Sequence, residues 1–260
     1  FVRTAGHSLV VHDLRKAVAA TLLGRGATWA ESARDAAAQS DVICICVQGP
    51  PEMRQVALGA GGILEGVKAG SVVIDLTTNA PAVVREVGEA LKTRGAHLLD
   101  APIDGGREGA QAGQVTLFVG GDEAVLSRVK PMLDTFSRSV VWVGELGTGS
   151  ITKIVHNALA MSIDLLVAEC LTLGAKAGVT VPRLVEAFNQ GCIVSQNMTF
   201  TQRMPATLFR GDFTARFAFR LDYTYYPGIE EPADSITWHV GDVTGTRRTY
   251  GLRRALPEDH

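Results

Sequence analysis

The chain has 260 residues, of which 46% are hydrophobic and 20% charged, and its formal net charge is −2. This composition indicates a globular protein, because disordered chains carry fewer apolar residues and a larger net charge. The small net charge argues against nucleic acid as a partner, and no basic run suggests a membrane surface. We therefore expect a small-molecule ligand, bound by one large or two modest domains.

The apolar stretches and the cysteines indicate the compartment. Charge or glycine interrupts each apolar stretch before about 18 residues, so the sequence predicts no transmembrane helix, and its amino end predicts no signal peptide. Cys44 and Cys46 lie two apart in an apolar strand, which is too close for the usual disulfide or zinc spacing. We interpret them as buried apolar residues of a reduced, cytoplasmic protein without a metal site.

The first half of the chain alternates short apolar strands with helices. Residues 41–47 are apolar on both faces, as a central parallel strand must be when helices cover both sides. The alternation predicts an α/β fold with a doubly wound, mostly parallel sheet. A nucleotide-binding sheet of this type also needs a first strand and a Gly-x-Gly-x-x-Gly turn, and nothing before Phe1 supplies them. The predicted sheet therefore lacks its first strand.

Polar residues follow several predicted strands, at the edge where open α/β sheets bind ligands. Asp13 ends one strand, where such a sheet places the carboxylate that binds the ribose hydroxyls, although a helix N-cap explains it equally well. Val47 and Gln48 end the strand at 41–47. Thr77 and Thr78 follow another strand, and they either cap the next helix or contact a cofactor or substrate.

Residues 101–113 form a glycine-rich segment without a hydrophobic period. The segment is longer than an ordinary connection of about two to six residues, so it predicts a long loop. Its paired glycines, Gly105 and Gly106, would let backbone amides approach a ligand. A bulged hairpin leading into the strand at 114–119 explains the segment equally well.

A long helix is predicted from 150 to 176, and it is apolar nearly all round, as in a core element or a subunit interface. Lys153 and Asn157 are four residues apart and therefore share one face of it. A positioned amine can move a proton, and a carboxamide can hold one small polar ligand. The glycines just before this helix predict an interdomain turn, and a short second helix is predicted over 182–190.

Four motifs in order carry a resemblance to a known family: Asp13, Asp-Leu-Thr-Thr at 75–78, Asp-Ala-Pro-Ile-Asp-Gly-Gly at 100–106, and Gly149-x-x-x-Lys153-x-x-x-Asn157. With them the chain resembles, over roughly residues 1 to 220, the β-hydroxyacid dehydrogenases, related to 6-phosphogluconate dehydrogenase. The resemblance implies a Rossmann-like NAD-binding domain at 1–148, with an incomplete amino end. An all-α domain with one long helix follows at 149–222, then an atypical tail at 223–260 without helical period.

The resemblance also implies an activity and roles for the motif residues. The enzyme would transfer a hydride between NAD(H) and a small β-hydroxy acid or its semialdehyde. Lys153 would be the general acid/base, Asn157 would hold the substrate, and Gly105 and Gly106 would receive its carboxylate. Thr78 would border the nicotinamide and Asp13 the adenosine ribose, and we expect Val47, Gln48 and Thr77 at the cofactor as well. A homodimer or higher homo-oligomer is implied too, because long helices in this family often cross between subunits.

Asp13 also bears on the choice of cofactor. Its carboxylate would repel a 2′-phosphate, and Leu14 stands where an arginine would be expected for NADP. The sequence therefore favours NAD, while Arg15 and Lys16 close by leave NADP open.

Asp104 departs from the family pattern, which usually has a serine there that hydrogen-bonds the substrate carboxylate. An ionised, desolvated Asp104 would oppose an acid substrate by several kcal/mol. This keeps two alternatives open: an imine-reductase-like enzyme acting on a cationic or neutral substrate, and a non-catalytic remnant of the family.

Overall fold

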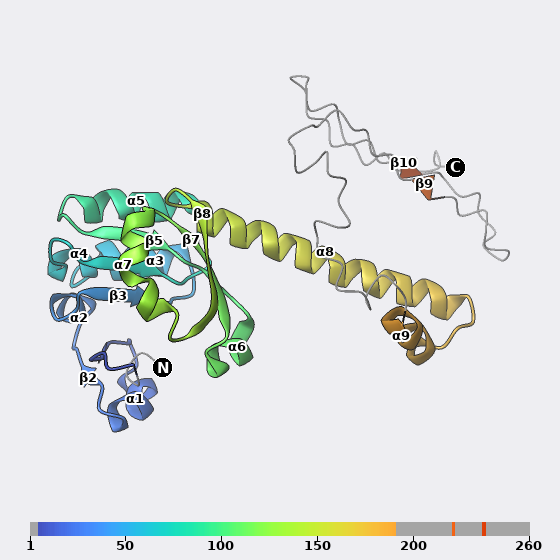
Figure 1. Ribbon diagram of the computed structural model, residues 1–260, viewed down its shortest axis with the longest axis horizontal. Helices are drawn as coiled ribbons and strands as arrows, with labels where there is room; N and C mark the ends of the chain where they lie inside the picture. The colour runs from blue at the N-terminus through green and yellow to red at the C-terminus, as the bar shows by residue number, and fades with distance from the viewer. Residues whose placement is uncertain (1–4, 191–219, 222–235, 238–260) are drawn as a thin grey trace, which may run out of the picture. The chain divides into compact units, whose positions relative to one another are not determined.

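The computed structural model describes residues 5–190, 220–221 and 236–237 (Figure 1). Its contacts divide the chain into two units, Phe1–Ser162 and Ile163–His260. The division falls inside the long helix α8 (Thr148–Lys176), whose first turns pack with the sheet of the first unit. Most of the predicted tail at 223–260 lies outside the described residues, as does Cys192.

The described part of the first unit contains alternating strands and helices, among them the 3-10 helix η1. In chain order before α8 they are β1 (Val10–Val11), η1 (Lys16–Ala19), α1 (Ala20–Gly24), β2 (Thr28–Trp29), α2 (Ala33–Ala38), β3 (Val42–Ile45), α3 (Pro50–Leu58), α4 (Ile63–Gly66), β4 (Val72–Asp75), α5 (Pro81–Lys92), β5 (His97–Asp100), β6 (Ile103–Asp104), α6 (Gly106–Ala112), β7 (Val115–Gly120), α7 (Glu123–Leu133) and β8 (Ser137–Gly144). The second unit contains α9 (Val181–Gln190) and the short antiparallel pair β9 (Arg220–Leu221) and β10 (Ile236–Thr237).

The main sheet has the strand order β3-β4-β5-β7-β6, with β8 paired to β7. Strands β3, β4 and β5 are parallel, whereas β7 runs antiparallel to β5 and β6 and parallel to β8. This confirms the predicted α/β fold with a mostly parallel sheet. Strands β1 and β2 form a separate parallel pair, so Asp13 follows a strand outside the main sheet.

The core consists of two apolar layers, one on each face of the main sheet. Successive residues of a strand point to opposite faces, so Val73 packs with helices α2 to α5, whereas Val72 and Ile74 pack with α7. Helix α5 shows the same logic with a helical period, because Val83, Val87 and the residues near them on one stripe are buried.

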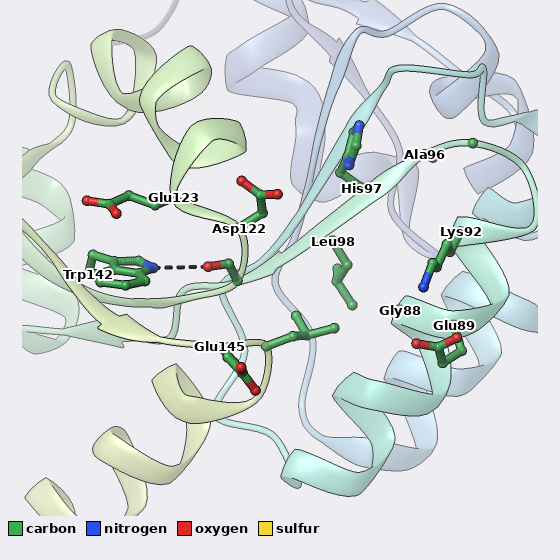
Figure 2. A pocket seen from close by; sticks show the side chains of 13 residues that line it. Gly88, Glu89, Lys92, Ala96, His97, Leu98, Asp122, Glu123, Trp142 and Glu145 are labelled. Carbon is green, nitrogen blue, oxygen red and sulfur yellow. Dashed lines mark hydrogen bonds between the residues drawn. The ribbon is translucent and has the colours of Figure 1, made fainter.

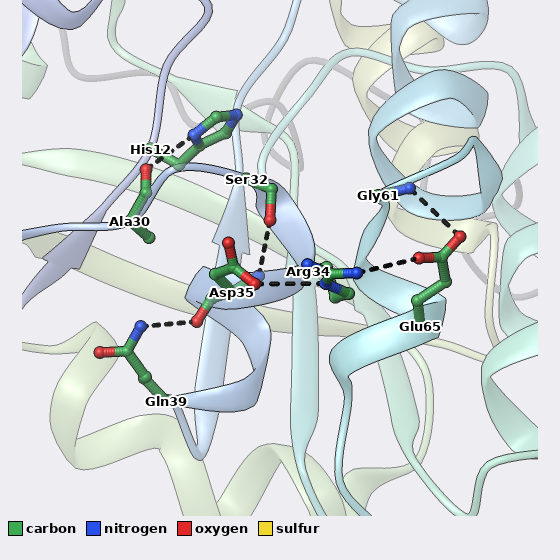
Figure 3. A network of polar contacts seen from close by, with 8 residues as sticks. All are labelled: His12, Ala30, Ser32, Arg34, Asp35, Gln39, Gly61 and Glu65. Atoms are coloured by element: carbon green, nitrogen blue, oxygen red, sulfur yellow. Dashed lines mark hydrogen bonds and ion pairs between the residues drawn. The ribbon is translucent and has the colours of Figure 1, made fainter.

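The polar network in Figure 3 holds α2 against α4. Ser32 caps α2 by accepting a hydrogen bond from the Asp35 amide at 3.0 Å. Arg34 donates to the Asp35 carboxylate at 3.2 Å and lies 4.0 Å from the Glu65 carboxylate. Glu65 in turn accepts from the amide of Gly61 at 3.2 Å, so the two short helices keep a fixed spacing.

Cys44 and Cys46 correct one expectation. Their neighbours Ile43 and Ile45 point into the core, but the two thiols lie on the opposite face of β3 and are exposed. The prediction that they are buried is therefore wrong. An apolar run indicates a strand with little polar surface, but it does not say which elements cover each face.

The glycine-rich segment at 101–113 is more ordered than the predicted long loop. Strand β6 pairs antiparallel with β7, which agrees with the hairpin alternative, and helix α6 follows it. None of the residues of α6 is buried, so the helix leaves no hydrophobic period in the sequence. Gly105, at φ +117°, begins the helix in a left-handed conformation that a side chain rarely adopts.

Helix α8 and helix α9 confirm the two predicted helices, and Gly178 at φ +95° follows α8. By length and composition α8 could span a membrane, although the sequence predicted no transmembrane helix. That property is weak evidence of a membrane, because long core and interface helices share it. The first turns of α8 are fixed to a buried carboxylate of the α/β sheet.

Candidate active site

A buried carboxylate holds the first turn of α8. Asp100 ends β5 and accepts hydrogen bonds from the amides of Gly147 and Ser150, both at 2.7 Å. A negative charge is favourable there because the first amides of a helix are unpaired and carry a partial positive charge. A Cβ on Gly149 would lie 2.4 Å from the Phe118 carbonyl oxygen, so only glycine permits this contact. The predicted interdomain turn is thus a rigid attachment of α8 to the sheet.

Lys153 lies one turn further along α8 and is only 8% exposed. Its Nζ donates a hydrogen bond of 2.7 Å to Oδ1 of Asp104, which lies on β6. This hydrogen bond and the ammonium charge hold the pKa of Asp104 below its usual range. The pair is therefore an ammonium and a carboxylate, anchored on two rigid elements that are 49 residues apart in the chain.

His156 brings a third ionisable group to this pair. Its Nδ1 lies 3.6 Å from the same Oδ1 of Asp104, and its ring is tilted against Phe118 of β7 with centroids 5.5 Å apart. The Nδ1 atom is buried and has no hydrogen-bond partner among the described residues. The sequence interpretation missed this residue. Its spacing of three from Lys153 was the available signal, because residues three apart on a helix share a face.

The other predicted substrate residues lie next to this cluster in the chain. Gly105 and Gly106 follow Asp104 directly, and both have positive φ, at +117° and +62°. Asn157 is half-buried on α8, and within the described part of the chain its carboxamide makes no hydrogen bond. The structure therefore brings Asp104 and Lys153 into contact and leaves the Asn157 amide able to bind a ligand.

The predicted cofactor residues Val47, Gln48, Thr77 and Thr78 lie at the carboxyl ends of β3 and β4. The Val47 amide donates to the Thr77 hydroxyl oxygen at 3.1 Å, which joins these neighbouring strand ends. Thr77 is buried, whereas Thr78 and Gln48 are exposed. Neither threonine caps helix α5, whose N-cap is Ala80, so that alternative is wrong.

Asp75 shapes the turn that carries these threonines, a role that the sequence interpretation did not assign. It is fully buried and accepts hydrogen bonds from the Thr77 amide at 3.0 Å and the Asn79 carboxamide at 2.9 Å. Burial raises the pKa of the Asp75 carboxyl group. The turn is thus fixed from inside, which leaves Thr78 at the surface.

Asp13 lies at the carboxyl end of β1 and is exposed. Its carboxylate accepts a hydrogen bond from the Arg15 amide at 2.8 Å, which forms a local turn and not a helix cap. Lys16 is engaged elsewhere, because its Nζ lies 3.5 Å from the Glu31 carboxylate and 5.1 Å from the Trp29 ring centroid. Asp13, Gln48 and Thr78 thus present accessible polar groups after parallel strands, a set that fits the ribose and carboxamide groups of a dinucleotide.

A separate hollow of about 550 Å³ lies beside α5 and β8 (Figure 2). Trp142 forms one side of it and donates from Nε1 to the Gly121 carbonyl oxygen at 3.0 Å. None of the predicted site residues lines this hollow. The cluster around Lys153 is therefore distinct from it.

Comparisons with known proteins match both halves of the chain. The NAD-binding domain of 6-phosphogluconate dehydrogenase matches residues 2–144, and the NAD-binding domain of NADP-dependent 3-hydroxyisobutyrate dehydrogenase matches 147–223. The chain is 30% identical over 218 residues to 2-(hydroxymethyl)glutarate dehydrogenase of Eubacterium barkeri, covering 84% of this chain and 72% of that one. It is 34% identical over 186 residues to 3-hydroxyisobutyrate dehydrogenase of Pseudomonas aeruginosa, covering 72% and 62%.

Solved structures give the same result. The crystal structure of 3-hydroxyisobutyrate dehydrogenase from Salmonella typhimurium matches with a TM-score of 0.64 and 31% identity, covering 82% of this chain and 74% of that one. The sequence comparisons and the fold comparison therefore indicate the same family.

Proposed function

The chain belongs to the β-hydroxyacid dehydrogenase family, whose members are NAD(P)-dependent oxidoreductases acting on CH–OH groups, and from this premise we propose that Lys153 is the general acid/base of its reaction. The proposal is supported by the buried Lys153 ammonium, which donates a 2.7 Å hydrogen bond to Asp104. Lys153 lies on α8, and the first turn of this helix is itself fixed to the sheet.

Lys153 acts on the substrate oxygen. NAD(H), when bound, supplies or accepts the hydride at the substrate carbon. In the reductive direction negative charge develops on the carbonyl oxygen, and the ammonium stabilises it and donates the proton. In the oxidative direction the neutral amine takes the proton of the hydroxyl group. Asp104 keeps the Lys153 side chain in one orientation, so the ammonium group is already positioned before the proton transfer.

The remaining predicted residues divide between substrate and cofactor. Asn157 binds the substrate with its carboxamide, and the segment that contains Gly105 and Gly106 receives a polar group of it. Gln48 and Thr78 contact the nicotinamide end of the cofactor, while Val47 and Thr77 hold that edge in place through their hydrogen bond. Asp13 binds the adenosine ribose.

Asp13 and Lys16 also support NAD over NADP. An exposed carboxylate opposes a 2′-phosphate, and Lys16 is already paired with Glu31. Calorimetry with NADH and NADPH tests the preference, and tighter binding of NADPH would contradict it.

Asp104 favours a second candidate substrate class. Its carboxylate already forms an ion pair with the Lys153 ammonium, so the carboxylate of an acid substrate beside Lys153 would be repelled by the negative charge of Asp104. A neutral or cationic substrate, such as an imine or an amine, meets no such charge. Wild type and Asp104→Ser should be compared on a panel of hydroxy acids, semialdehydes and imines. If the serine variant gains no activity on the acids relative to the imines, the second candidate fails.

Lys153→Ala tests the leading proposal directly. We expect unchanged NADH affinity by calorimetry and a loss of turnover of about 10² to 10⁴, the usual contribution of a general acid/base. Lys92→Ala, a change in the last turn of α5, is the matched control and should keep wild-type activity. Activity retained in Lys153→Ala would refute the role.

The assembly we propose is a homodimer or higher homo-oligomer formed through α8. Several large apolar side chains of this helix are exposed, among them Val155 at 63%, Met161 at 69% and Leu165 at 67%. Faces of this kind are usually covered by another chain. Sedimentation of wild type and Leu165→Glu tests the proposal, and a wild-type monomer would contradict it.

A cytoplasmic location is proposed as well, because exposed thiols such as Cys44, Cys46 and Cys170 persist in a reducing compartment. Cell fractionation tests it, and recovery in a membrane or secreted fraction would contradict it.

A further inference from the structure

The burial of Lys153 limits how it can regain a proton from water. It is 8% exposed, and in each reductive turnover it gives up one proton that must be replaced from water. A substrate and a nicotinamide placed against the ammonium would cover it further. The replacement proton therefore needs a route through protein groups or has to wait until the site empties.

Asp104 and His156 provide such a route. The side-chain exposure rises along the series, from 10% for Lys153 to 30% for Asp104 and 42% for His156. The Oδ1 atom of Asp104 lies 2.7 Å from Lys153 Nζ and 3.6 Å from His156 Nδ1, so one oxygen faces both bases. Because Nδ1 of His156 is buried while the side chain is 42% exposed, the exposure belongs to other atoms of that side chain.

The separation between His156 Nδ1 and Asp104 Oδ1 is slightly longer than a hydrogen bond. A separation of 3.6 Å is too long for a hydrogen bond, but such contacts in an unliganded site are often long and shorten in the complex. The Phe118 ring is tilted beside the imidazole ring, with the two ring centroids 5.5 Å apart. No described residue competes for the Nδ1 atom, since it has no other partner in that part of the chain.

We propose that His156 and Asp104 form a proton relay that recharges Lys153 from solvent. The inference rests on the proposed role of Lys153. Water gives a proton to Nε2 at the exposed edge of the imidazole, His156 Nδ1–H passes its proton to Oδ1 of Asp104, and that carboxyl O–H passes it to the neutral Lys153 amine. The imidazole is then left with its proton on Nε2, so before the next turnover the ring rotates to expose Nδ1 to water, where Nδ1 takes up a proton and Nε2 loses one. One proton enters from water for each proton that the substrate oxygen has taken, and in the oxidative direction the same steps run in reverse.

After Lys153 has given up its proton, the ammonium charge that lowers the pKa of Asp104 is absent, so Asp104 can take a proton at that stage. The charged groups that act on Asp104 are Lys153 and His156, both on α8, and the Gly105 amide adds a hydrogen bond from the start of α6. The side chain that β7 contributes beside His156 is the apolar Phe118. In the relay His156 acts through Asp104 and Lys153 and is therefore a positioning residue.

The relay separates the first turnover from later ones. In His156→Gln, Lys153 starts protonated, so the first turnover in a stopped-flow burst should match the wild type. Later turnovers need a new proton, so in a dilute, bulky buffer the steady-state rate should fall by at least about tenfold. Added imidazole should restore it. His97→Gln, a change at the exposed start of β5, is the matched control and should behave as wild type.

Three kinetic results would overturn the relay. These are a wild-type steady-state rate for His156→Gln in dilute buffer, a first turnover slowed as much as later ones, and a loss that imidazole does not rescue. The second of these would assign His156 a merely structural role.

A readout without catalysis separates this inference from the proposed function. Nitrogen-15 spectra of the imidazole at neutral pH should show His156 with its proton on Nδ1, facing Asp104, and a mixture of tautomers in Asp104→Ser. If wild type shows no turnover with any substrate, the proposed function fails, and the tautomer still decides the relay geometry. A proton on Nε2 in wild type would refute that geometry by itself.

Discussion

Asp100→Asn should destabilise the fold far more than the same change at Asp122, although both carboxylates accept two hydrogen bonds from backbone amides at a helix start. Asp100 is fully buried and binds Gly147 and Ser150, both at 2.7 Å. Asp122 is exposed and caps α7 through Ala124 at 2.8 Å and Val125 at 3.2 Å. The pair therefore isolates the effect of burial.

The magnitude follows from the two amides at Asp100. Each hydrogen bond to a charged acceptor contributes about 1.5–3 kcal/mol, and an asparagine carbonyl can keep only one of them. The asparagine amino group then faces the second amide, which remains unsatisfied at a cost of about 1–3 kcal/mol. We expect a loss of about 3 kcal/mol, or roughly 6–12 °C in Tm. At Asp122 we expect less than about 0.5 kcal/mol, because asparagine and aspartate are similar N-caps.

Urea denaturation followed by circular dichroism measures both variants against wild type. The slope of the free energy of unfolding against urea should stay constant, since the folded state buries the same surface. If the two variants lose stability equally, within about 0.5 kcal/mol, the buried carboxylate does not hold α8 and the argument for a rigid Lys153 fails.

Three further predictions test the supports of the site. Gly149→Ala should cost at least about 1–3 kcal/mol in urea denaturation, because its Cβ would overlap the carbonyl oxygens of Phe118 and Asp100, whereas Gly109→Ala in α6 has room and should be neutral or slightly stabilising. The pKa of Asp104 is lowered in the folded state, so its ion pair with Lys153 stabilises the fold above the unfolded pKa of about 3.9, and this contribution is lost as the pH falls through the folded pKa. The difference in the free energy of unfolding between wild type and Asp104→Asn should therefore shrink from pH 7 to pH 3, and a constant difference would contradict the ion pair. Thr77→Val should lower the free energy of unfolding by about 1 kcal/mol and also weaken NADH binding, because it leaves the Val47 amide unpaired. Thr78→Val should weaken NADH binding alone, and equal losses of stability in the two variants would refute the different roles of the two threonines.

Periodicity predicted those parts of the fold whose side chains are buried. Strands β3 to β5 and helix α5 followed from apolar runs and stripes, since the core requires these patterns. Helix α8 followed from its long apolar run, although most of its large apolar side chains are exposed. Helix α6 could not be found in this way, because none of its residues is buried. The exposure of Cys44 and Cys46 was equally unpredictable, because it depends on what covers one face of β3.

The candidate site was predictable where spacing along one helix places the groups. Lys153 and Asn157 share a face of α8, and the same reasoning would have found His156. Asp104 was predicted from the motif that it interrupts, but its hydrogen bond to Lys153 depends on β6 pairing with β7, a contact between distant segments. The roles of Asp75 and Asp100 were missed for a similar reason, because an acidic residue at a strand end does not reveal whether it binds a ligand or its own backbone.

The central claim is that Lys153, fixed to the sheet through α8, moves the proton of the reaction. The most direct measurement is the single-turnover rate of NADH oxidation in wild type and Lys153→Ala, with and without added methylamine, at equal cofactor saturation. We predict a loss of about 10² to 10⁴ that methylamine partly restores, with NADH affinity unchanged. A Lys153→Ala rate within tenfold of wild type would contradict the account.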